Sequence, residues 1–283
     1  MRDSTAIPSP GPSVDPTASP PTSGFVLEAD EVTLGYPGMQ VSSALSVGIR
    51  PGTFTVIVGP NACGKSTLLK ALARVLPPES GEIRLDGHDI RSLRSKQVAR
   101  RISLLPQSAI APDGITVADL VARGRHPHQG IFQQWRTSDE QAVAAALAAT
   151  GCTPLAARLV DELSGGQRQR VWLAMLLAQE TPVLLLDEPT TFLDVAHQFD
   201  LLELLRSLHD EGRTVVAVLH DLNQAFRYAS DLIVMKEGRV VATGAPREVI
   251  DADLVADVFG LPCLVVPDPI TGTPNVVALD PRG

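Results

Sequence analysis

The sequence has little of what marks a secreted, membrane-spanning or nucleic-acid-binding protein. Its three cysteines, Cys63, Cys152 and Cys263, form no C-x-x-C pair and are too few for a disulfide framework, so a reducing compartment is expected. The N-terminus lacks the basic start and apolar core of a secretion signal. No apolar run approaches the ~18 residues needed to cross a bilayer. Any role at a membrane therefore requires a partner.

Basic residues are also fewer than acidic residues. The chain has 24 Lys and Arg against 32 Asp and Glu, a formal net charge of −8. A clustered basic surface is the electrostatic footprint of a nucleic-acid-binding protein, so nucleic acid is not an expected partner. With 283 residues, the chain is long enough to bury a full core as one large domain or two small ones.

One motif organises the rest of the chain. It fits the pattern G-x-x-x-x-G-K-[ST] and consists of Gly59, Pro60, Asn61, Ala62, Cys63, Gly64, Lys65, Ser66 and Thr67. The short β-branched run 54–58 before it predicts a buried strand, and the amphipathic stretch 66–76 after it predicts a helix that stops at Pro77. The alternative is a chance match in a turn, which this strand and helix disfavour.

The chemistry of phosphate binding explains these residue types. Backbone N–H groups of such a loop and of the following helix start form a nest for anions. Lys65 is expected to reach the β- and γ-phosphates of a nucleotide, and the Ser66 hydroxyl is expected to bind Mg²⁺. Cys63, inside the loop, is expected to be sensitive to alkylation, as a probe and not a nucleophile.

A second stretch, 163–170, predicts another anion site. Ser164 fits a helix N-cap, and the glycines Gly165 and Gly166 leave the start of the helix sterically open. The positive end of the helix dipole and its unpaired N–H groups would face outward there. The alternative is a plain helix start, for which two adjacent glycines are a poor choice.

Polar residues follow the ends of three predicted strands. The all-apolar strand 183–186 runs into Asp187 and Glu188, the strand 214–219 runs into His220, and the strand 102–107 ends in Gln107. Ligands in open α/β sheets bind beyond the carboxyl ends of strands. Adjacent carboxylates point in different directions, so one of the pair can face a metal and the other a water. The alternatives are helix capping for the acids and a structural role for His220.

Around this centre the chain divides into segments. Residues 1–23 are rich in Pro and Ser and are expected to form a disordered tail. Short strands and turns are expected over 25–49, an exposed hairpin strand over 81–87, and a helical insert over about 108–178. A short helix is expected near 246–259, followed by a loop-like appendage over 263–283.

With these residues assembled, the sequence resembles the ATP-binding cassette (ABC) ATPases from Phe25 to about Val266. The most specific mark is the stretch 163–167, Leu-Ser-Gly-Gly-Gln, which is similar to the family signature. The resemblance implies an α/β fold: a P-loop NTPase (RecA-like) core with an antiparallel β subdomain and an inserted α-helical subdomain. The ATPase domain would span 24–262, and ATP and Mg²⁺ would be its cofactors.

The resemblance also implies roles for single residues. Tyr36 would stack on adenine, although an isolated tyrosine in a strand is as often only packed. Gln107 would contact Mg²⁺ and the attacking water. Asp187 would hold the metal through water, Glu188 would be the catalytic base, and His220 would contact the γ-phosphate.

The family works as a head-to-tail pair. Asp194 matches the loop that crosses the dimer interface, and the signature of one copy would clamp the ATP held by Lys65 of the other. The signature residues are Ser164, Gly165, Gly166 and Gln167. Ala62 stands where many relatives have glycine, which would cost little if its φ were negative.

Within the family, the runs 61–63 and 124–128 are most similar to ATPase subunits of iron–siderophore importers, with haem and cobalamin importers as close neighbours. Such a subunit would lie peripherally on the cytoplasmic face of the membrane, with two permease subunits and, indirectly, a periplasmic or extracellular binding protein as partners. The alternatives are a soluble ABC ATPase acting on DNA or ribosomes, and a regulator that binds nucleotide without turnover.

The segment 124–135 is predicted to dock on the permease. Arg125, His126, His128 and Trp135 interrupt a regular helical pattern, and arginine and aromatic residues often anchor interfaces. The alternative is a solvated loop between helices.

Overall fold

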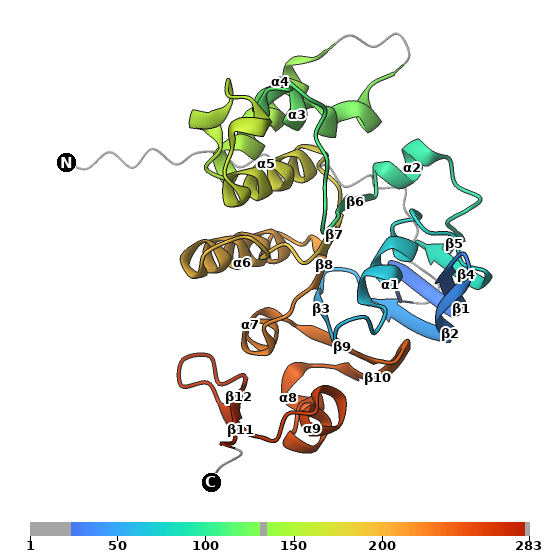
Figure 1. The fold of residues 1–283 in the computed structure, drawn as a ribbon. Helices are drawn as coiled ribbons and strands as arrows, with labels where there is room; N and C mark the ends of the chain where they lie inside the picture. Colours follow the sequence, from blue (N-terminus) through green and yellow to red (C-terminus); the bar gives the residue numbers. More distant parts are fainter. Residues whose placement is uncertain (1–23, 131–134, 281–283) are drawn as a thin grey trace.

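The computed structural model describes residues 24–130 and 135–280. The tail expected over 1–23 lies outside the described residues. Figure 1 shows the described parts stacked from top to bottom: a helical part, a central sheet, and a C-terminal part, with a second sheet to the right of the centre. The antiparallel β subdomain and the α-helical insert expected from the sequence are both present, on an α/β core.

The central sheet has six strands in the order β10-β9-β3-β8-β7-β6. Its members are β3 (Phe54–Val58), β6 (Ile102–Leu105), β7 (Val183–Asp187), β8 (Thr214–Val218), β9 (Asp231–Lys236) and β10 (Arg239–Gly244). All neighbours pair in parallel except β9 and β10. Every residue of β3, β7 and β8 is buried, as expected for strands that helices or a second sheet cover on both faces.

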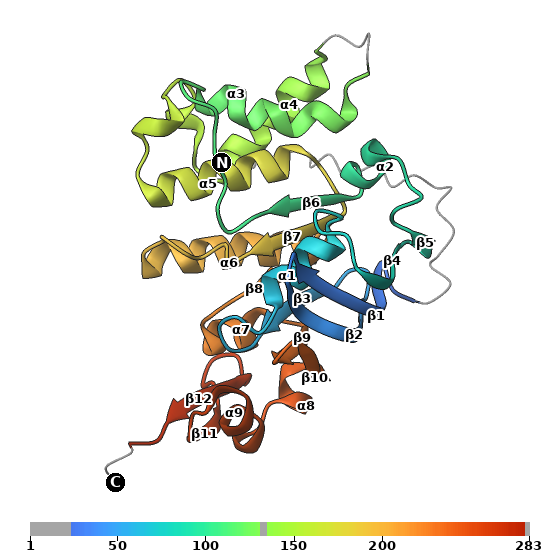
Figure 2. The ribbon, with the colours of Figure 1, turned by 45° about the vertical axis from the view of Figure 1, so that its right-hand side comes forward.

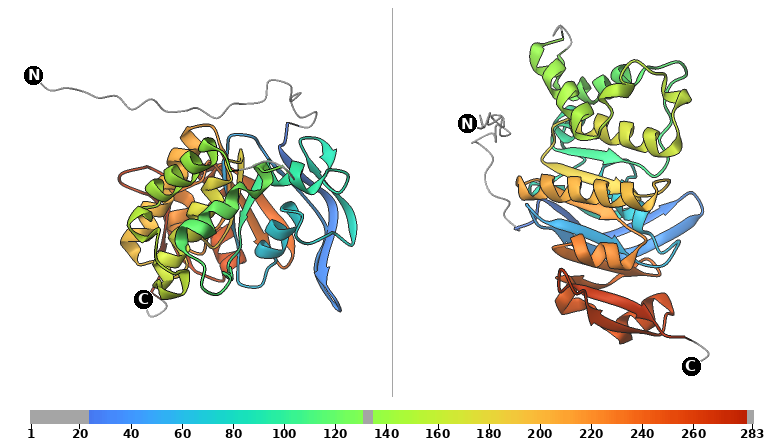
Figure 3. Two further views of the ribbon diagram at one scale, coloured as in Figure 1. Left: turned by 90° about the horizontal axis from the view of Figure 1, so that it is seen from above. Right: turned by 90° about the vertical axis from the view of Figure 1, so that its left-hand side faces the viewer.

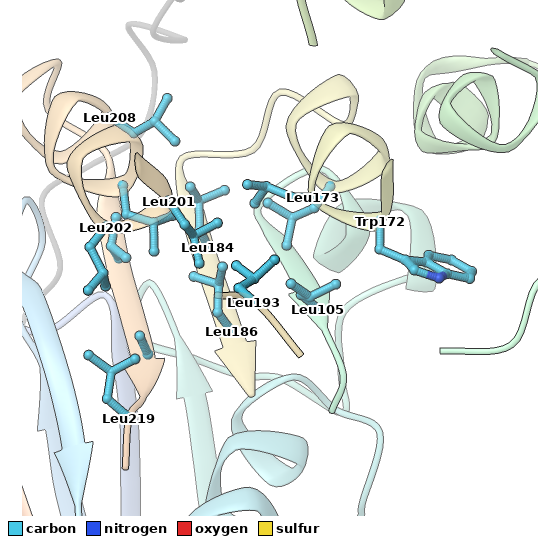
Figure 4. Packing of buried hydrophobic residues seen from close by; sticks show 14 of the residues in the cluster. Leu105, Trp172, Leu173, Leu184, Leu186, Leu193, Leu201, Leu202, Leu208 and Leu219 are labelled. Atoms are coloured by element: carbon cyan, nitrogen blue, oxygen red, sulfur yellow. The ribbon is translucent and has the colours of Figure 1, made fainter. Parts of the chain in front are cut away.

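Alternate residues of these strands enter two separate cores. On one face Leu184 and Leu186 pack with α5 (Gly165–Ala178) and α6 (Val195–Asp210), as Figure 4 shows. On the other face Val183 and Leu185 pack with α1 (Lys65–Leu72) and the second sheet. The view from above in Figure 3 shows α6 (orange) on one side of the molecule and the second sheet (blue) on the other.

The second sheet is antiparallel, in the order β2-β1-β4-β5, and its strands β1 and β2 are longer than the short ones expected over 25–49. Its members are β1 (Leu27–Tyr36), β2 (Met39–Ile49), β4 (Ser80–Leu85) and β5 (His88–Asp89). Glu31 and Ala44 have positive φ, and the register of β1 on β2 shifts between Ala29 and Val32. Such bulges interrupt the alternation of buried and exposed residues along a strand. The sequence pattern therefore did not reveal that β1 and β2 are long. The strand β4 is also not simply exposed, since Ile83 and Leu85 are buried.

In its described residues, the insert between β6 and β7 forms three α-helices and three short 3₁₀ turns, and Figure 2 shows the helices grouped above the central sheet. In chain order they are α3 (Val117–Ala122), η1 (Arg123–His128), α4 (Thr137–Ala149), η2 (Thr153–Leu155), η3 (Val160–Glu162) and α5. Both α3 and α4 pack on α5. The short helix α2 (Ser95–Ala99) lies against η1 from the core side.

Helix α1 ends earlier than the sequence suggested. Arg74 adopts a left-handed conformation with φ 60°, and the N–H groups of Val75 and Leu76 both donate to the carbonyl of Lys70. This backbone turn ends the helix before Pro77 is reached.

The C-terminal part is more ordered than expected. It begins with two short helices, α8 (Pro246–Val249) and α9 (Ala252–Phe259), in place of one. The stretch expected to be loop-like forms an antiparallel hairpin of β11 (Cys263–Pro267) and β12 (Pro274–Ala278). This hairpin packs on α7 (Leu222–Tyr228).

Candidate active site

The loop after β3 lies at the centre of the site, at the start of α1. A Cβ atom on Gly59 would lie 2.3 Å from the carbonyl oxygen of Met235, so only glycine allows this approach of the two backbones. Lys65 is 5% exposed, and its Nζ donates to the carbonyl oxygens of Gly59 and Pro60, each at 2.8 Å. The ammonium group is thus folded over the loop, where it can exchange these carbonyls for phosphate oxygens.

The condition for a low cost at Ala62 is not met, and the expected alkylation of Cys63 is wrong. Ala62 has φ 61° and not a negative φ, so it occupies the left-handed region that glycine tolerates best, at a local cost of about 1–2 kcal/mol. Cys63 is 5% exposed, with its sulfur packed beneath Gly59, and burial raises the pKa of its thiol. A buried thiol with a raised pKa is a poor target for alkylation.

The carboxylate at the end of β7 meets the phosphate loop. Ser66 Oγ donates to Asp187 Oδ1 at 2.7 Å, while Asp187 Oδ2 is buried and has no hydrogen-bond partner. Burial raises the pKa of Asp187, the nearby charge of Glu188 raises it further, and the Ser66 hydrogen bond opposes both. A hydroxyl and an unpartnered carboxylate oxygen are the hard ligands that Mg²⁺ prefers, so these residues fit the expected metal.

Glu188, the next residue, has different partners and links the ends of three neighbouring strands. Glu188 Oε2 accepts a hydrogen bond from Gln107 Nε2 at 2.8 Å, and Glu188 Oε1 lies 2.6 Å from His220 Nε2. These residues follow β6, β7 and β8, which are adjacent and parallel, so their carboxyl ends meet at one edge. The sequence reasoning placed them at this edge, and the structure brings them into contact.

Glu188 has an unusual backbone conformation and a further neighbour, Thr191, that was not predicted from the sequence. The φ of Glu188 is 54°, in the left-handed region, where a non-glycine residue is strained and where active-site residues are often found. Thr191 Oγ1 lies 3.4 Å from Glu188 Oε2. A hydroxyl three residues after a carboxylate is a signal that could have singled Thr191 out.

The second anion motif forms the capped helix start that was expected. Ser164 Oγ accepts from the Gln167 N–H at 3.3 Å, and Gln167 Oε1 accepts from the Ser164 N–H at 3.1 Å. This reciprocal capping box fixes the start of α5. Gln169 Nε2 donates to the carbonyl of Pro189 at 3.1 Å, which fastens α5 to the loop after Glu188.

Two other expected site residues lie at element ends. Asp194 caps α6, where its Oδ1 accepts from the N–H of His197 at 2.9 Å, and its side chain is 67% exposed. Tyr36 ends β1, half-buried, opposite Met39. The stacking of Tyr36 on a base stays a prediction.

Arg125 is not the exposed docking residue that the sequence suggested. Its side chain is 5% exposed, and it bonds to Asp139 at 2.8 Å, to Glu180 at 2.6 Å and to the carbonyl of Ala178 at 2.7 Å. His128 likewise pairs with the carbonyl of Gln179 at 2.8 Å. Arg125 therefore fastens η1 to the start of α4 and the end of α5, and only Trp135, at 43% exposure, and His126 keep a surface position.

Comparison with known proteins decides the family. Residues 42–191 match the family model described as ABC transporter. This chain belongs to that family. It is 57% identical to the ferric enterobactin transport ATP-binding protein FepC of Escherichia coli (strain K12) over 254 residues, 89% of this chain and 94% of the relative. It is 49% identical to the petrobactin import ATP-binding protein FpuD of Bacillus anthracis, over 88% of this chain and 91% of the relative.

Solved structures agree with this membership. One, described as an inward-facing metal-chelate type ABC transporter, superposes with a TM-score of 0.77 at 28% identity, covering 91% of this chain and 98% of that one. The dimeric structure of MJ0796, a bacterial ABC transporter cassette, superposes with a TM-score of 0.71 at 27% identity, covering 77% and 98%. The chain is thus an ABC-type ATPase in fold as well as in sequence.

Proposed function

We propose that this chain is the ATP-hydrolysing subunit that drives import of a ferric siderophore through a separate membrane permease. The observation that carries the proposal is the 57% identity to the ferric enterobactin protein along nearly the whole of both chains. Other relatives are named for petrobactin, achromobactin and iron(3+)-hydroxamate transport. A cobalamin import relative is 44% identical, and the chain covers 65% of its length.

ATP would bind along the phosphate loop. The loop N–H groups and the start of α1 supply partial positive charge to the phosphates. Lys65 would leave the carbonyls of Gly59 and Pro60 for the β- and γ-phosphates, and Tyr36 would cover the base. The loop residues assigned to this role are Gly59, Pro60, Asn61, Ala62, Cys63, Gly64, Lys65, Ser66 and Thr67.

Mg²⁺ would be held by Ser66 and Asp187, with Gln107 near it. When bound, the ion neutralises charge on the phosphates during phosphoryl transfer. The unpartnered Oδ2 of Asp187 supports this assignment, because a buried carboxylate oxygen without a partner is costly unless a ligand completes it.

Hydrolysis would use Glu188 as the general base. The hydrogen bond from Gln107 and the 2.6 Å contact with His220 Nε2 hold the two carboxylate oxygens at the sheet edge, where an attacking water would be oriented. His220 would turn to the γ-phosphate when ATP is present, which would free one oxygen of Glu188 to accept the proton. General-base catalysis of this kind contributes roughly 10²–10⁴-fold to a rate.

Two copies would close on two ATP molecules in a head-to-tail dimer. In support, two structures of the cassette MJ0796 that resemble this chain are described as dimeric. The exposed Ser164 cap and the positive end of α5 would meet the γ-phosphate held by the other copy. The residues assigned to this contact are Ser164, Gly165, Gly166, Gln167 and Asp194.

The dimer would lie peripherally on the cytoplasmic face of the membrane, bound to two permease subunits, with an external binding protein acting through them. Within residues 24–130 and 135–280, no helix is long and apolar enough to cross a membrane. The helical insert would be the docking element, through surface residues such as His126 and Trp135, since Arg125 is buried.

The test is reconstitution with a membrane permease for ferric siderophores. Vesicles that contain both should take up radiolabelled ferric siderophore with ATP, and a Glu188→Gln chain should not support uptake. Uptake of cobalamin or haem without ferric siderophore would overturn the substrate assignment and keep the importer. No uptake, with ATPase activity unaffected by any permease, would favour the non-transport alternatives.

A further inference from the structure

The side chain of Gln198, on α6, joins segments that follow two neighbouring strands of the central sheet. Its Nε2 donates to the carbonyl of Leu193 at 3.1 Å and to the carbonyl of Thr190 at 3.4 Å. Its Oε1 accepts from Nε2 of Gln224, on α7, at 2.9 Å. The two carbonyls belong to the loop after β7, whereas α7 follows β8. One amide group therefore fixes the distance between these two segments of chain.

Only one orientation of the Gln198 amide satisfies these contacts. A glutamine offers two donors at Nε2 and an acceptor at Oε1, and the carbonyls of Thr190 and Leu193 can only accept. Nε2 must therefore face the loop, which leaves Oε1 for the amide of Gln224. Gln224 is 9% exposed, and its backbone N–H donates to Oδ1 of Asp221 at 2.8 Å. The first turn of α7 is thus fixed through both its backbone and a side chain.

The loop that Gln198 holds begins at a strained residue, Glu188, with φ 54°. Two turns follow it. The Thr191 N–H donates to the carbonyl of Glu188 at 3.2 Å. The Leu193 N–H donates to the carbonyl of Thr190 at 3.3 Å, and Gln198 binds the carbonyls of these same two residues. A strained backbone persists only where the surrounding structure over-determines it, and the Gln198 amide is one of those constraints.

The two segments joined by Gln198 carry a pair of groups on which the proposed hydrolysis depends. Glu188 Oε1 lies 2.6 Å from His220 Nε2. A contact this short between residues on separate strands requires that their backbones keep a fixed separation. The register of β7 on β8 ends at the pair Asp187 and Val218. Beyond that pair, the hydrogen bonds of Gln198 continue the link between the two segments.

We propose that Gln198 is a positioning residue for ATP hydrolysis, which keeps Glu188 and His220 at the separation that the reaction needs. The inference rests on the proposed role of Glu188 as general base. Gln198 acts through the backbone of the two segments and not on the nucleotide. Misplacing a catalytic group by about 1 Å can cost roughly 10²-fold in rate. Gln198 therefore contributes to kcat, while ATP binding, which depends on the loop 59–67, is independent of it.

A second link between the same two helices supplies a matched control. Tyr228 Oη donates to Oε1 of Glu203 at 2.8 Å, and the guanidinium of Arg227 lies 5.9 Å from the centre of the Phe199 ring. These contacts join α6 and α7 farther along both helices. They should keep the helices packed when the amide of Gln198 is removed. Tyr228→Phe breaks one hydrogen bond of this second link and leaves the loop after β7 untouched.

The test measures steady-state phosphate release by the full-length chain with ATP and Mg²⁺. Gln198→Met keeps a long, unbranched side chain and removes the amide. It should lower kcat about 10- to 100-fold and leave KM for ATP within about twofold of the wild type. Gln224→Met should also lower kcat, and the double variant should be no slower than Gln198→Met, because the two residues share one hydrogen bond. Tyr228→Phe should keep the wild-type kcat.

A second cycle tests whether Gln198 acts through Glu188. In a chain that already carries Glu188→Gln, the further change Gln198→Met should lower the residual rate by less than about twofold, because the base that Gln198 positions is no longer there. Single-turnover phosphate release measures this slow rate. A melting curve of each variant shows whether the chain is folded at the temperature of the assay.

Each outcome decides for or against the inference. A wild-type kcat in Gln198→Met, or a loss no larger than that in Tyr228→Phe, would overturn it. So would a loss in the Glu188→Gln chain as large as in the wild type. If Gln198→Met does not fold, Gln224→Met decides instead, and an unchanged kcat there would overturn the inference. If Glu188→Gln alone keeps the wild-type rate, the base of the proposed function is wrong. A slow Glu188→Gln chain beside a fast Gln198→Met chain would refute the positioning role alone.

Discussion

Replacing Arg125 by methionine should destabilise the whole chain, because it breaks a buried ion pair. The carboxylate of Asp139 is 6% exposed and lies 2.8 Å from Arg125 Nε. Without the guanidinium, the hydrogen bond that Asp139 keeps among the described residues is the one from the N–H of Arg136, at 3.1 Å, and the carbonyl of Ala178 loses this donor. Glu180 is 53% exposed and can be solvated by water instead, so the loss of its ion pair with Arg125 adds little to the destabilisation.

The expected size follows from these partners. Removing one member of a buried pair leaves an uncompensated charge and typically costs about 3–5 kcal/mol. Because Asp139 retains one backbone hydrogen bond, we expect the lower end, about 3 kcal/mol. That is a large part of the 5–15 kcal/mol of stability typical of a domain, on the order of a third of it.

Urea unfolding followed by circular dichroism measures the effect, with two comparisons. Arg123→Met, an exposed arginine on the same η1 segment, should change stability by less than about 0.5 kcal/mol. Adding Asp139→Asn to Arg125→Met should restore part of the loss, because no unpaired charge remains buried. A loss below about 1 kcal/mol in Arg125→Met, or no recovery in the double variant, would refute the reasoning.

Further predictions concern the site. Lys65→Ala should abolish tight ATP binding, since phosphoryl transfer sites depend on positioning and charge; unchanged affinity in a titration with a fluorescent ATP analogue would mean that the loop is misassigned. Glu188→Gln should lower the hydrolysis rate roughly 10²–10⁴-fold while ATP still binds, and a wild-type rate in a phosphate-release assay would exclude Glu188 as the base. Asp187→Asn should stabilise the nucleotide-free chain by about 1 kcal/mol at neutral pH, because it removes a buried carboxylate kept for function. Burial raises the pKa of Asp187 in the folded state, so the wild type gains stability as the pH falls through that raised value, and the advantage of the Asp187→Asn variant should shrink there. Denaturation at neutral and mildly acidic pH checks this, and an advantage that grows on acidification would contradict it.

The parts of the site predicted from sequence are those that local patterns specify. The phosphate loop, the fully apolar strands β3, β7 and β8, and the capping box at Ser164 each depend on residues close together in the chain. The rule that ligands bind beyond the carboxyl ends of strands then predicted that Glu188 and His220 share a site, and the family resemblance added Gln107.

The predictions that failed concern backbone conformation or distant partners. The ion partners of Arg125 lie 14 and 55 positions away, so a charged residue in a polar stretch gave no sign of burial. The positive φ of Ala62 is imposed by the loop and not by the residue itself. In the C-terminal hairpin, Asp268 Oδ1 accepts from the N–H groups of Ile270 and Thr271, which fixes the turn between the two strands that were expected to be loop-like.

The C-terminal hairpin is hydrogen-bonded to α7, the helix after His220, so a movement of that helix can be followed at the hairpin. Asn223, near the start of α7, donates from Nδ2 to the carbonyl of Val276 at 3.3 Å and accepts from the Val276 N–H at 2.8 Å. The backbone amide of Val276 is therefore tied to the helix that begins two residues after His220. Its hydrogen-exchange rate can serve as an intrinsic reporter of whether that helix shifts between nucleotide states. A chain shortened at residue 262 would lose this reporter and leave the Asn223 amide without its partner.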